Sequence, residues 1–229
     1  MEYKLKVVSG QLIFLPDNLP VPFESDLACS QLFMQFYADG RADRFAKLGS
    51  WDQHIGEARI QTKWITTLSQ NVDVKPSEDA FFDVLSVISE LINQAHTINS
   101  GVSLKLLRDG LKALTCDAQA QKVFFDSVFK RSVSDLTLND QGSLNVCFLL
   151  SVLNPQNQLL TVQVRLSVHG DPGANIFIRP LEGKELIGTP SLTVSSAELN
   201  TRMYDKVRGN INALVKDIAV DQIVDLAIH

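Results

Sequence analysis

Cysteine and histidine are the residue types in this 229-residue chain that could support nucleophilic catalysis or bind a metal, and their spacing indicates neither. The three cysteines, Cys29, Cys116 and Cys147, are far apart, and no CxxC pair or Cys/His spacing typical of zinc occurs. Cys147 stands within a continuous apolar run, so we predict a buried free thiol. Burial among apolar residues raises the pKa of a thiol and makes it a poor nucleophile.

The four histidines show no catalytic pattern either. They are His54, His96, His169 and His229, and no two have the i, i+4 separation with which a helix presents two ligands to a metal. We therefore predict surface or packing roles for them. A dyad of Cys147 with His96 or His169 stays open, because catalytic partners need only meet in space.

Other catalytic motifs are missing as well. The chain has no HExxH, GxSxG, P-loop, GxGxxG or EF-hand pattern. Asp126, Asp135 and Asp140 are interpreted as solvated strand ends and turns rather than as paired catalytic carboxylates. The sequence thus predicts a protein that is not an enzyme and needs neither a metal nor a cofactor.

Composition and length indicate an ordinary globular protein. Apolar residues make up 45% and charged residues 21%, and no linker-like break divides the chain, so residues 1–229 are expected to form one domain. The net charge of −5, with no cluster of Lys and Arg, argues against a nucleic-acid partner. No apolar run suits a signal peptide or a spanning helix, so we predict a soluble protein whose membrane role, if any, comes from rearrangement or surface binding.

The N-terminal third predicts short elements. They are strands at 4–8 and 11–15, helices at 26–38 and 41–48, and a strand within 57–69. Pro16, Pro20 and Pro22 are expected to hold the chain extended up to about residue 24, because proline fixes φ and lacks an amide donor.

An antiparallel helical hairpin is predicted next. Pro76-Ser77-Glu78-Asp79 is typical of a helix start, and an apolar stripe follows, so we expect a helix at 77–96. Asn99-Ser100-Gly101 is expected to end it, and leucines at i, i+3 and i+7 predict a second helix at 102–115.

Four consecutive strands are predicted after the hairpin. Their ranges are 122–129, 145–153, 161–168 and 175–181. The second is apolar at nearly every position, which is typical of a central strand covered on both faces, whereas the third alternates. A helix from Ala197 to about Ile218 within a C-terminal helical segment, 197–229, supplies the second cover. The predicted fold class is α/β, a three-layer domain with a mostly antiparallel sheet between helical hairpins.

The order of these elements resembles the Cyt δ-endotoxin family of cytolysins. The resemblance spans roughly residues 25–195 and is most local in two passages. One is Ile65 to Leu91 with Ser69-Gln70-Asn71-Val72 before the apolar helix, and the other is Ser143 to Asn154. Because 197–229 is longer and more charged than is expected of the family, its proteolytic processing sites are not transferred.

The resemblance implies a non-enzymatic protein that binds target-cell membrane lipids and permeabilises membranes, by pores or in a detergent-like way, with insects as a common target. The helices at 77–96 and 102–115 would move off the sheet, and strands around 123–181 would enter lipid. Strands in lipid must pair their backbone groups, and four strands cannot close a barrel, so a homo-oligomer is expected. The membrane-interacting residues implied are Phe81, Phe82, Leu85, Ile88, Leu104, Leu107, Leu111, Val123, Phe125, Phe129, Val146, Phe148, Leu150, Val152, Val162, Val164, Leu166, Val168, Ile176 and Ile178.

Two arginines count against simple insertion. Arg165 and Arg179 fall on predicted strands, and an arginine at the bilayer midplane costs about 2–4 kcal/mol, so each would have to face a lumen or headgroups. Two alternatives stay open. One is a non-lytic lipid-binding or virulence-associated module with a lipid between helices and sheet, and the other is an enzyme that uses Cys147 or a histidine.

Overall fold

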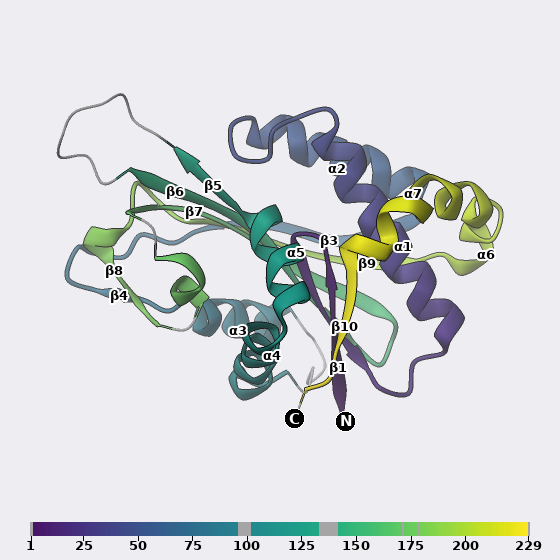
Figure 1. Cartoon of the computed structure of the whole chain (residues 1–229), viewed down its shortest axis with the longest axis horizontal. Coiled ribbons are helices and arrows are strands. Elements are labelled where there is room, and N and C mark those ends of the chain that lie inside the picture. Colours follow the sequence, from purple (N-terminus) through teal and green to yellow (C-terminus); the bar gives the residue numbers. More distant parts are fainter. Residues whose placement is uncertain (1, 96–101, 133–141, 171, 178, 229) are drawn as a thin grey trace.

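The protein is a large mixed sheet with helices packed on both of its faces, as the computed structural model shows (Figure 1). The structure describes residues 2–95, 102–132, 142–170, 172–177 and 179–228. The predicted α/β class, with a mostly antiparallel sheet between helical layers, is confirmed.

The sheet has the strand order β10-β1-β2-β6-β7-β9-β3, and β5 also pairs with β6. The β2–β6 pair is parallel and the other pairs of this sheet are antiparallel. The strands are β1 (Tyr3–Val8), β2 (Gln11–Pro16), β3 (Trp64–Asp73), β5 (Phe129–Ser132), β6 (Ser143–Leu153), β7 (Gln158–His169), β9 (Ser191–Leu199) and β10 (Ile223–Leu226).

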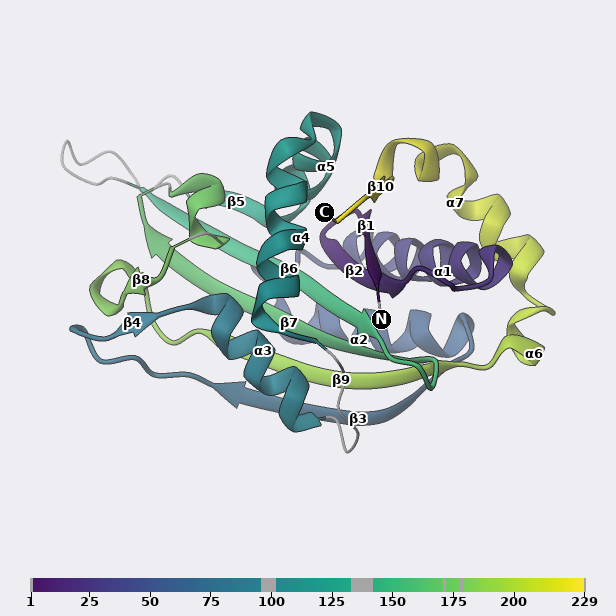
Figure 2. The same cartoon turned by 90° about the horizontal axis from the view of Figure 1, so that it is seen from below.

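Helices cover the two faces in separate groups (Figure 2). One face carries α3 (Val84–Ala95), α4 (Leu104–Cys116) and α5 (Ala118–Val128). The opposite face carries α1 (Val21–Asp39), α2 (Leu48–Gln61), α6 (Thr201–Tyr204) and α7 (Arg208–Gln222). A small second sheet pairs β4 (Phe81–Phe82) with β8 (Leu181–Glu182), next to the 3-10 turns Gly173–Phe177 and Gly183–Glu185.

The N-terminal hairpin forms as predicted, but the prolines after it do not act as expected. Ser9 adopts the left-handed φ of 50° that the tight turn between β1 and β2 needs. Pro20 and Pro22 flank Val21 at the start of α1 instead of extending the chain to residue 24. The amide groups in the first turn of a helix have no acceptor within the helix, so proline, which lacks an amide proton, is tolerated there.

Two predictions in the next segment are wrong. The expected short helix at 41–48 is absent, since the helical part of this segment begins at Leu48 and runs to Gln61. The expected strand within 57–69 therefore begins late, at Trp64. Lys63, with φ 62°, reverses the chain between α2 and β3, a break that the alternating pattern did not reveal.

The prediction of the helical hairpin is correct for its second helix, whereas the first helix begins later than predicted. The helix α4 begins after Ser103, whose hydroxyl accepts a hydrogen bond from the Leu106 amide. The helix α3 begins at Val84 rather than at residue 77, because Phe81–Phe82 pairs with β8 and the Asp83 carboxylate accepts from the Leu85 and Ser86 amides. The predicted stop at 99–101 lies outside the described residues.

Of the four predicted strands, the two central ones are confirmed. Residues 122–128 are helical, because Ala120, Val123, Phe124 and Val128 share one buried helix face, and the strand begins only at Phe129. Residues 175–177 belong to a 3-10 turn and Leu181 is the first residue of β8, so no strand spans the predicted range.

The charged and C-terminal positions shift accordingly. Asp126 lies on α5 rather than at a strand end, and Arg179 lies outside any strand. The predicted C-terminal helix starts too early, since Ala197 and Leu199 belong to β9. Asp135 and Asp140 lie outside the described residues.

Candidate functional site

The face of the sheet beneath α3, α4 and α5 is continuous and apolar. Alternate residues of β6 and β7 point into this layer, and each is at most 6% exposed. They are Val146, Phe148, Leu150 and Val152 on β6 and Val162, Val164, Leu166 and Val168 on β7. These residues form a surface covered by helices, and their contact with lipid stays a prediction.

The covering helices contribute matching apolar residues. Leu85, Ile88, Leu107, Leu111 and Val123 are buried against the sheet. The helix α4 approaches closely because Gly110 faces the Phe14 ring, where an added Cβ would lie 2.5 Å from a ring carbon. The same helix turns basic residues outward, so the layer is apolar on one side and polar on the other.

The other predicted membrane residues occupy the rim of this cluster. Phe82 and Ile176 are buried in it, and Leu104, Phe125 and Phe129 pack against it with part of their surface exposed. Phe81 is 70% exposed and lies outside the cluster. Ile178 lies outside the described residues.

Aromatic rings join α5 and β5 to the sheet. Phe148 meets Phe177 edge to face at 5.0 Å between ring centroids, and Phe125 stacks on Phe129 at 5.4 Å. Phe124 contacts both Phe148 and Phe177. Such aromatic pairs stabilise packing beyond the burial of their apolar area, so they strengthen the attachment of α5 to the sheet.

Polar contacts between α3 and α4 lie at the surface of the layer. Arg108 Nη2 donates to Asp83 Oδ2 at 3.1 Å, which ties the start of α3 to α4. Burial raises the pKa of Asp83, but hydrogen bonds from Ser86 and the charge of Arg108 outweigh burial and lower it below its ordinary value.

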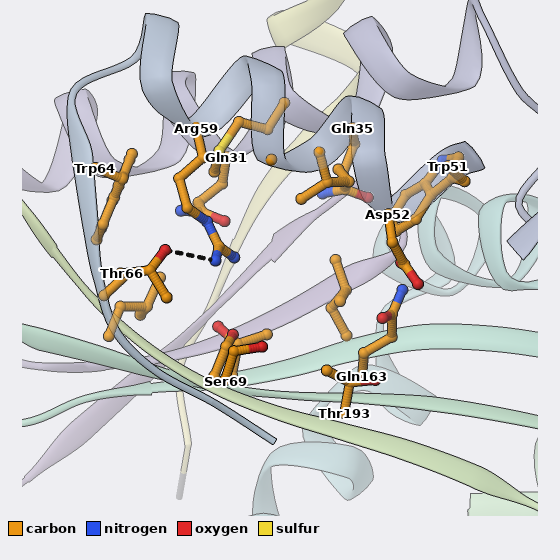
Figure 3. A pocket seen from close by; sticks show the side chains of 18 of the residues that line it. Gln31, Gln35, Trp51, Asp52, Arg59, Trp64, Thr66, Ser69, Gln163 and Thr193 are labelled. Atoms are coloured by element: carbon orange, nitrogen blue, oxygen red, sulfur yellow. Dashed lines mark hydrogen bonds between the residues drawn. The ribbon is translucent and has the colours of Figure 1, made fainter. Parts of the chain in front are cut away.

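The opposite face of the sheet holds a polar cavity of about 400 Å³ (Figure 3). It lies between α1 and α2 on one side and β3, β7 and β9 on the other. Buried polar side chains form much of its wall, while Thr66 and Ser69 of the edge strand β3 are exposed at its mouth. The polar wall residues are Gln31, Gln35, Thr161, Gln163, Thr193 and Ser195.

One side of the cavity is fixed by an internal hydrogen-bond network. Gln11 Nε2 donates to Ser151 Oγ at 2.7 Å, and Ser151 Oγ lies 2.7 Å from Thr161 Oγ1. Gln35 Nε2 donates to the Val8 carbonyl at 2.9 Å. These groups are satisfied within the protein and hold α1 in register with the sheet.

An ion pair closes one end of the cavity. Arg165 Nη1 donates to Asp52 Oδ2 at 2.8 Å. With the Gln163 amide oriented to satisfy both groups, its nitrogen donates to Asp52 and its oxygen accepts from Arg165. Burial alone would lower the pKa of Arg165, but the hydrogen bond and charge of Asp52 raise it. Arg165 therefore belongs to the layer of α2, on the face away from α3–α5.

Arg59 stands at the other end and differs from Arg165. It projects from the last turn of α2 into the cavity, and its Nη1 donates to Thr66 Oγ1 at 3.0 Å (Figure 3). It forms no ion pair with the residues that the structure describes. Burial lowers the pKa of the Arg59 guanidinium, with no carboxylate to counter the effect.

Within the part of the chain that the structure describes, the residues first considered for catalysis do not assemble. Cys147 is a buried free thiol, as predicted, and burial raises its pKa. His169 pairs with Ser143, four residues along β6 from Cys147, which is roughly 13 Å and excludes a dyad between them. His54 bonds Glu57, while His96 and His229 lie outside the described residues. Within the described ranges, no three His, Cys, Asp or Glu side chains are grouped to hold a metal ion.

Sequence reasoning missed the cavity. Gln31 and Gln35 stand one turn apart on α1, a signal that a polar group faces inward, but nothing local connects them to β3 or β9. Arg59 falls in the segment predicted to contain a strand, 57–69, so the sequence does not predict its position on a helix above Thr66.

None of the helices within the described ranges combines the length and apolar character needed to cross a bilayer.

Comparisons with known proteins give structural neighbours only. No protein-family model matches the chain, and no curated protein matches it. Similar solved structures include a delta-endotoxin, with 10% identity, a TM-score of 0.46 and coverage of 82% of this chain and 80% of that one. The activated Cyt2Ba monomer from Bacillus thuringiensis subsp. israelensis has 12% identity and a TM-score of 0.42 over 83% and 97% of the two chains.

The structural neighbours thus include the Cyt δ-endotoxins that the sequence resembles. A third is the Evf virulence factor, with 9% identity and a TM-score of 0.38 over 92% of this chain and 84% of that one. Likeness at these TM-scores carries no argument about activity, so function has to be inferred from the geometry of this chain.

Proposed function

We propose that this protein permeabilises membranes by moving the α3–α5 layer off the sheet. The observation that carries the proposal is the one-sided sheet: eight alternate residues of β6 and β7 form an unbroken apolar face covered by amphipathic helices. Separation of the two would produce one apolar sheet face and one apolar helix face, and a lipid interface can receive both.

The outer surface of α4 supports contact with lipid headgroups. Lys105, Arg108 and Lys112 are exposed on the side of α4 opposite its buried leucines. An amphipathic helix with a basic outer face suits the interface between phosphate groups and acyl chains. This surface would be the first to meet an anionic membrane.

Release of the layer in water is strongly unfavourable. Burying one large aliphatic or aromatic side chain contributes about 1.5–3 kcal/mol, so uncovering several costs on the order of 10 kcal/mol. The movement would therefore take place at the lipid surface, which replaces the lost apolar contacts. Inserted strands must pair their backbone groups, so copies of the chain would associate on the membrane.

The two arginines restrict which layer moves. Arg165 bonds Asp52 on the face under α2, so that layer has to stay on the sheet to keep the charge paired. Arg179 bonds Glu185 through Nη1 at 2.8 Å, outside the strands, and need not enter lipid. The opening would therefore be confined to α3–α5.

A reversible lock tests this movement. The native cysteines are replaced by alanine, and a new cysteine pair joins α3 to β7, which it contacts. We expect the oxidised protein to release no dye from lipid vesicles and the reduced protein to recover release. A matched pair that joins α1 to α7 on the other face should leave dye release unchanged. Dye release by the α3–β7 lock in its oxidised form would refute the opening step.

A non-lytic ligand-binding module is the second candidate, favoured by the polar cavity under α2. Absence of leakage at every lipid composition and pH, by a protein that still binds ligand in this cavity, would select it over the lytic function. We propose no enzymatic activity for either candidate.

A further inference from the structure

We propose that the cavity between α2 and the β3–β9 edge of the sheet binds the phosphate group of a small ligand, with Arg59 as its principal contact. The phosphate belongs either to a free phosphorylated molecule or to a lipid headgroup. This proposal does not rest on membrane permeabilisation, because the cavity lies on the opposite face of the sheet from α3–α5.

The charges of the cavity point to an anion. Asp52 is the carboxylate at its wall, and Arg165 already bonds it. Arg59 retains a full positive charge with one hydroxyl partner, Thr66. The C-terminal dipole of α2 favours a cation at this position and so supports the charged form of Arg59. Arg59 is half-buried at the cavity and forms no ion pair with the described residues, so an oxyanion that enters the cavity would give its guanidinium a charged partner.

The arrangement of donors favours phosphate over a planar carboxylate. Arg59 descends from α2, and Ser69 lies on the strand opposite to it (Figure 3). A tetrahedral phosphate presents oxygens to both sides at once, so the guanidinium above and the hydroxyls of β3 below can donate together. The side chain of Gln31 has no hydrogen-bond partner among the described residues and faces the same space.

The cavity is large enough to hold the rest of a small phosphorylated molecule as well as its phosphate group. About 400 Å³ is within the usual range for small-molecule sites and exceeds the need of a lone inorganic ion. The inner wall alternates hydroxyl and amide groups with Met34, Ile55 and Leu159. A short polyol such as glycerol phosphate matches that mixture, which makes it a suitable probe.

Calorimetric titration tests the proposal with two sources of phosphate. The soluble probe is glycerol 3-phosphate, with glycerol as the neutral control, and the lipid probe is vesicles of phosphatidylglycerol. We expect saturable binding to at least one phosphate probe and none to glycerol. Binding to the soluble probe identifies a free metabolite class, and binding to vesicles alone identifies a headgroup.

Two variants, each with a matched control, decide whether the cavity is responsible. Arg59→Gln should weaken binding at least tenfold, whereas Arg202→Gln, which removes a cation from exposed α6, should not. Gly56 lines the cavity, and an added Cβ there meets nothing within 4 Å, so Gly56→Leu should fill the space and abolish binding. Gly49→Leu, on the same helix but outside the cavity, should bind as the wild type does.

The result is decisive in either direction. Loss of binding in Arg59→Gln and Gly56→Leu, with both controls intact and all variants folded by circular dichroism, supports the site. No saturable binding to either probe, or equal binding by wild type and Arg59→Gln, overturns it. Vesicle leakage is recorded separately, so a failure here does not alter the test of the α3–β7 lock.

Discussion

The two faces of the same strands differ in kind. On β6, Phe148 and Leu150 point into an apolar layer, while Ser151 between Leu150 and Val152 points into a hydrogen-bond network. Apolar packing is non-directional, so a lipid tail can replace a helix against that face. Hydrogen bonds require partners at fixed distances and angles, so the polar face keeps its geometry. One sheet can therefore combine a removable cover with a fixed pocket.

The separation depends on strand register. Residues i and i+2 share a face, so the β6–β7 pairing sets which side chains meet α3–α5 and which meet α1 and α2. A slip of one residue would place Arg165 and Gln163 under the apolar helices. The long β6–β7 pairing, from Ser143–His169 to Leu153–Leu159, opposes such a slip.

The largest effect is expected from truncation on the apolar face. Phe148→Ala should lower the free energy of unfolding by about 3–5 kcal/mol, because it leaves a cavity among Phe124, Phe177 and α5. Urea denaturation measures the loss. Phe36→Ala, at a 40% exposed position on α1, is the control and should cost far less. Equal losses of unfolding free energy in the two variants would mean that Phe148 contributes no more to stability than an exposed phenylalanine does.

A smaller and chemically different effect is expected on the polar face. Ser151→Ala should cost about 1–3 kcal/mol, since the Gln11 amide and the Thr161 hydroxyl both lose a buried partner. The change removes one oxygen and almost no volume, so the loss reports hydrogen bonding rather than packing. Ser50→Ala, exposed on α2, should change the unfolding midpoint little. An unchanged free energy of unfolding in Ser151→Ala would show that this hydrogen-bond network does not stabilise the polar face.

The smallest effect concerns pH and the tie between α3 and α4. The pKa of Asp83 is lowered from its ordinary 3.8, so its contribution is present above pH 3.8 and is lost as pH falls through the lower pKa of the folded state. We expect less than about 1 kcal/mol, because the pair with Arg108 is near the surface. Urea midpoints between pH 2 and 6 should fall less steeply for Asp83→Asn than for wild type. Parallel curves would contradict this role.

The sequence predicted the parts whose pattern has a single interpretation. The long apolar run of β6 and the alternation of β7 favour central strands, and the leucine spacing of α4 favours a helix. Val123-Phe124-Phe125 is different, because three apolar residues in a row suit a strand as well as a wide helix face. Asp117, which accepts from the Ala120 amide, was the start signal that distinguishes the two.

The candidate sites follow the same division. The apolar face could be predicted because burial depends on residue type, which the sequence displays directly. The cavity could not, because Arg59, Thr161 and Ser195 come together only when three strands and two helices are placed in space. A sequence does not show which arginine lacks an ion pair, because the spatial neighbours of each charged side chain are known only from the fold.

The pairing of β1 with β10 has a consequence for how the chain is made. Leu5 meets Leu226, so β1 remains without one neighbour until more than two hundred further residues have been synthesised. Contacts this distant in sequence slow folding, and an unpaired strand edge invites association between nascent chains. The completion of the sheet at β1 is thus a late step, and a chain halted before Ile223 would present an open edge to its neighbours.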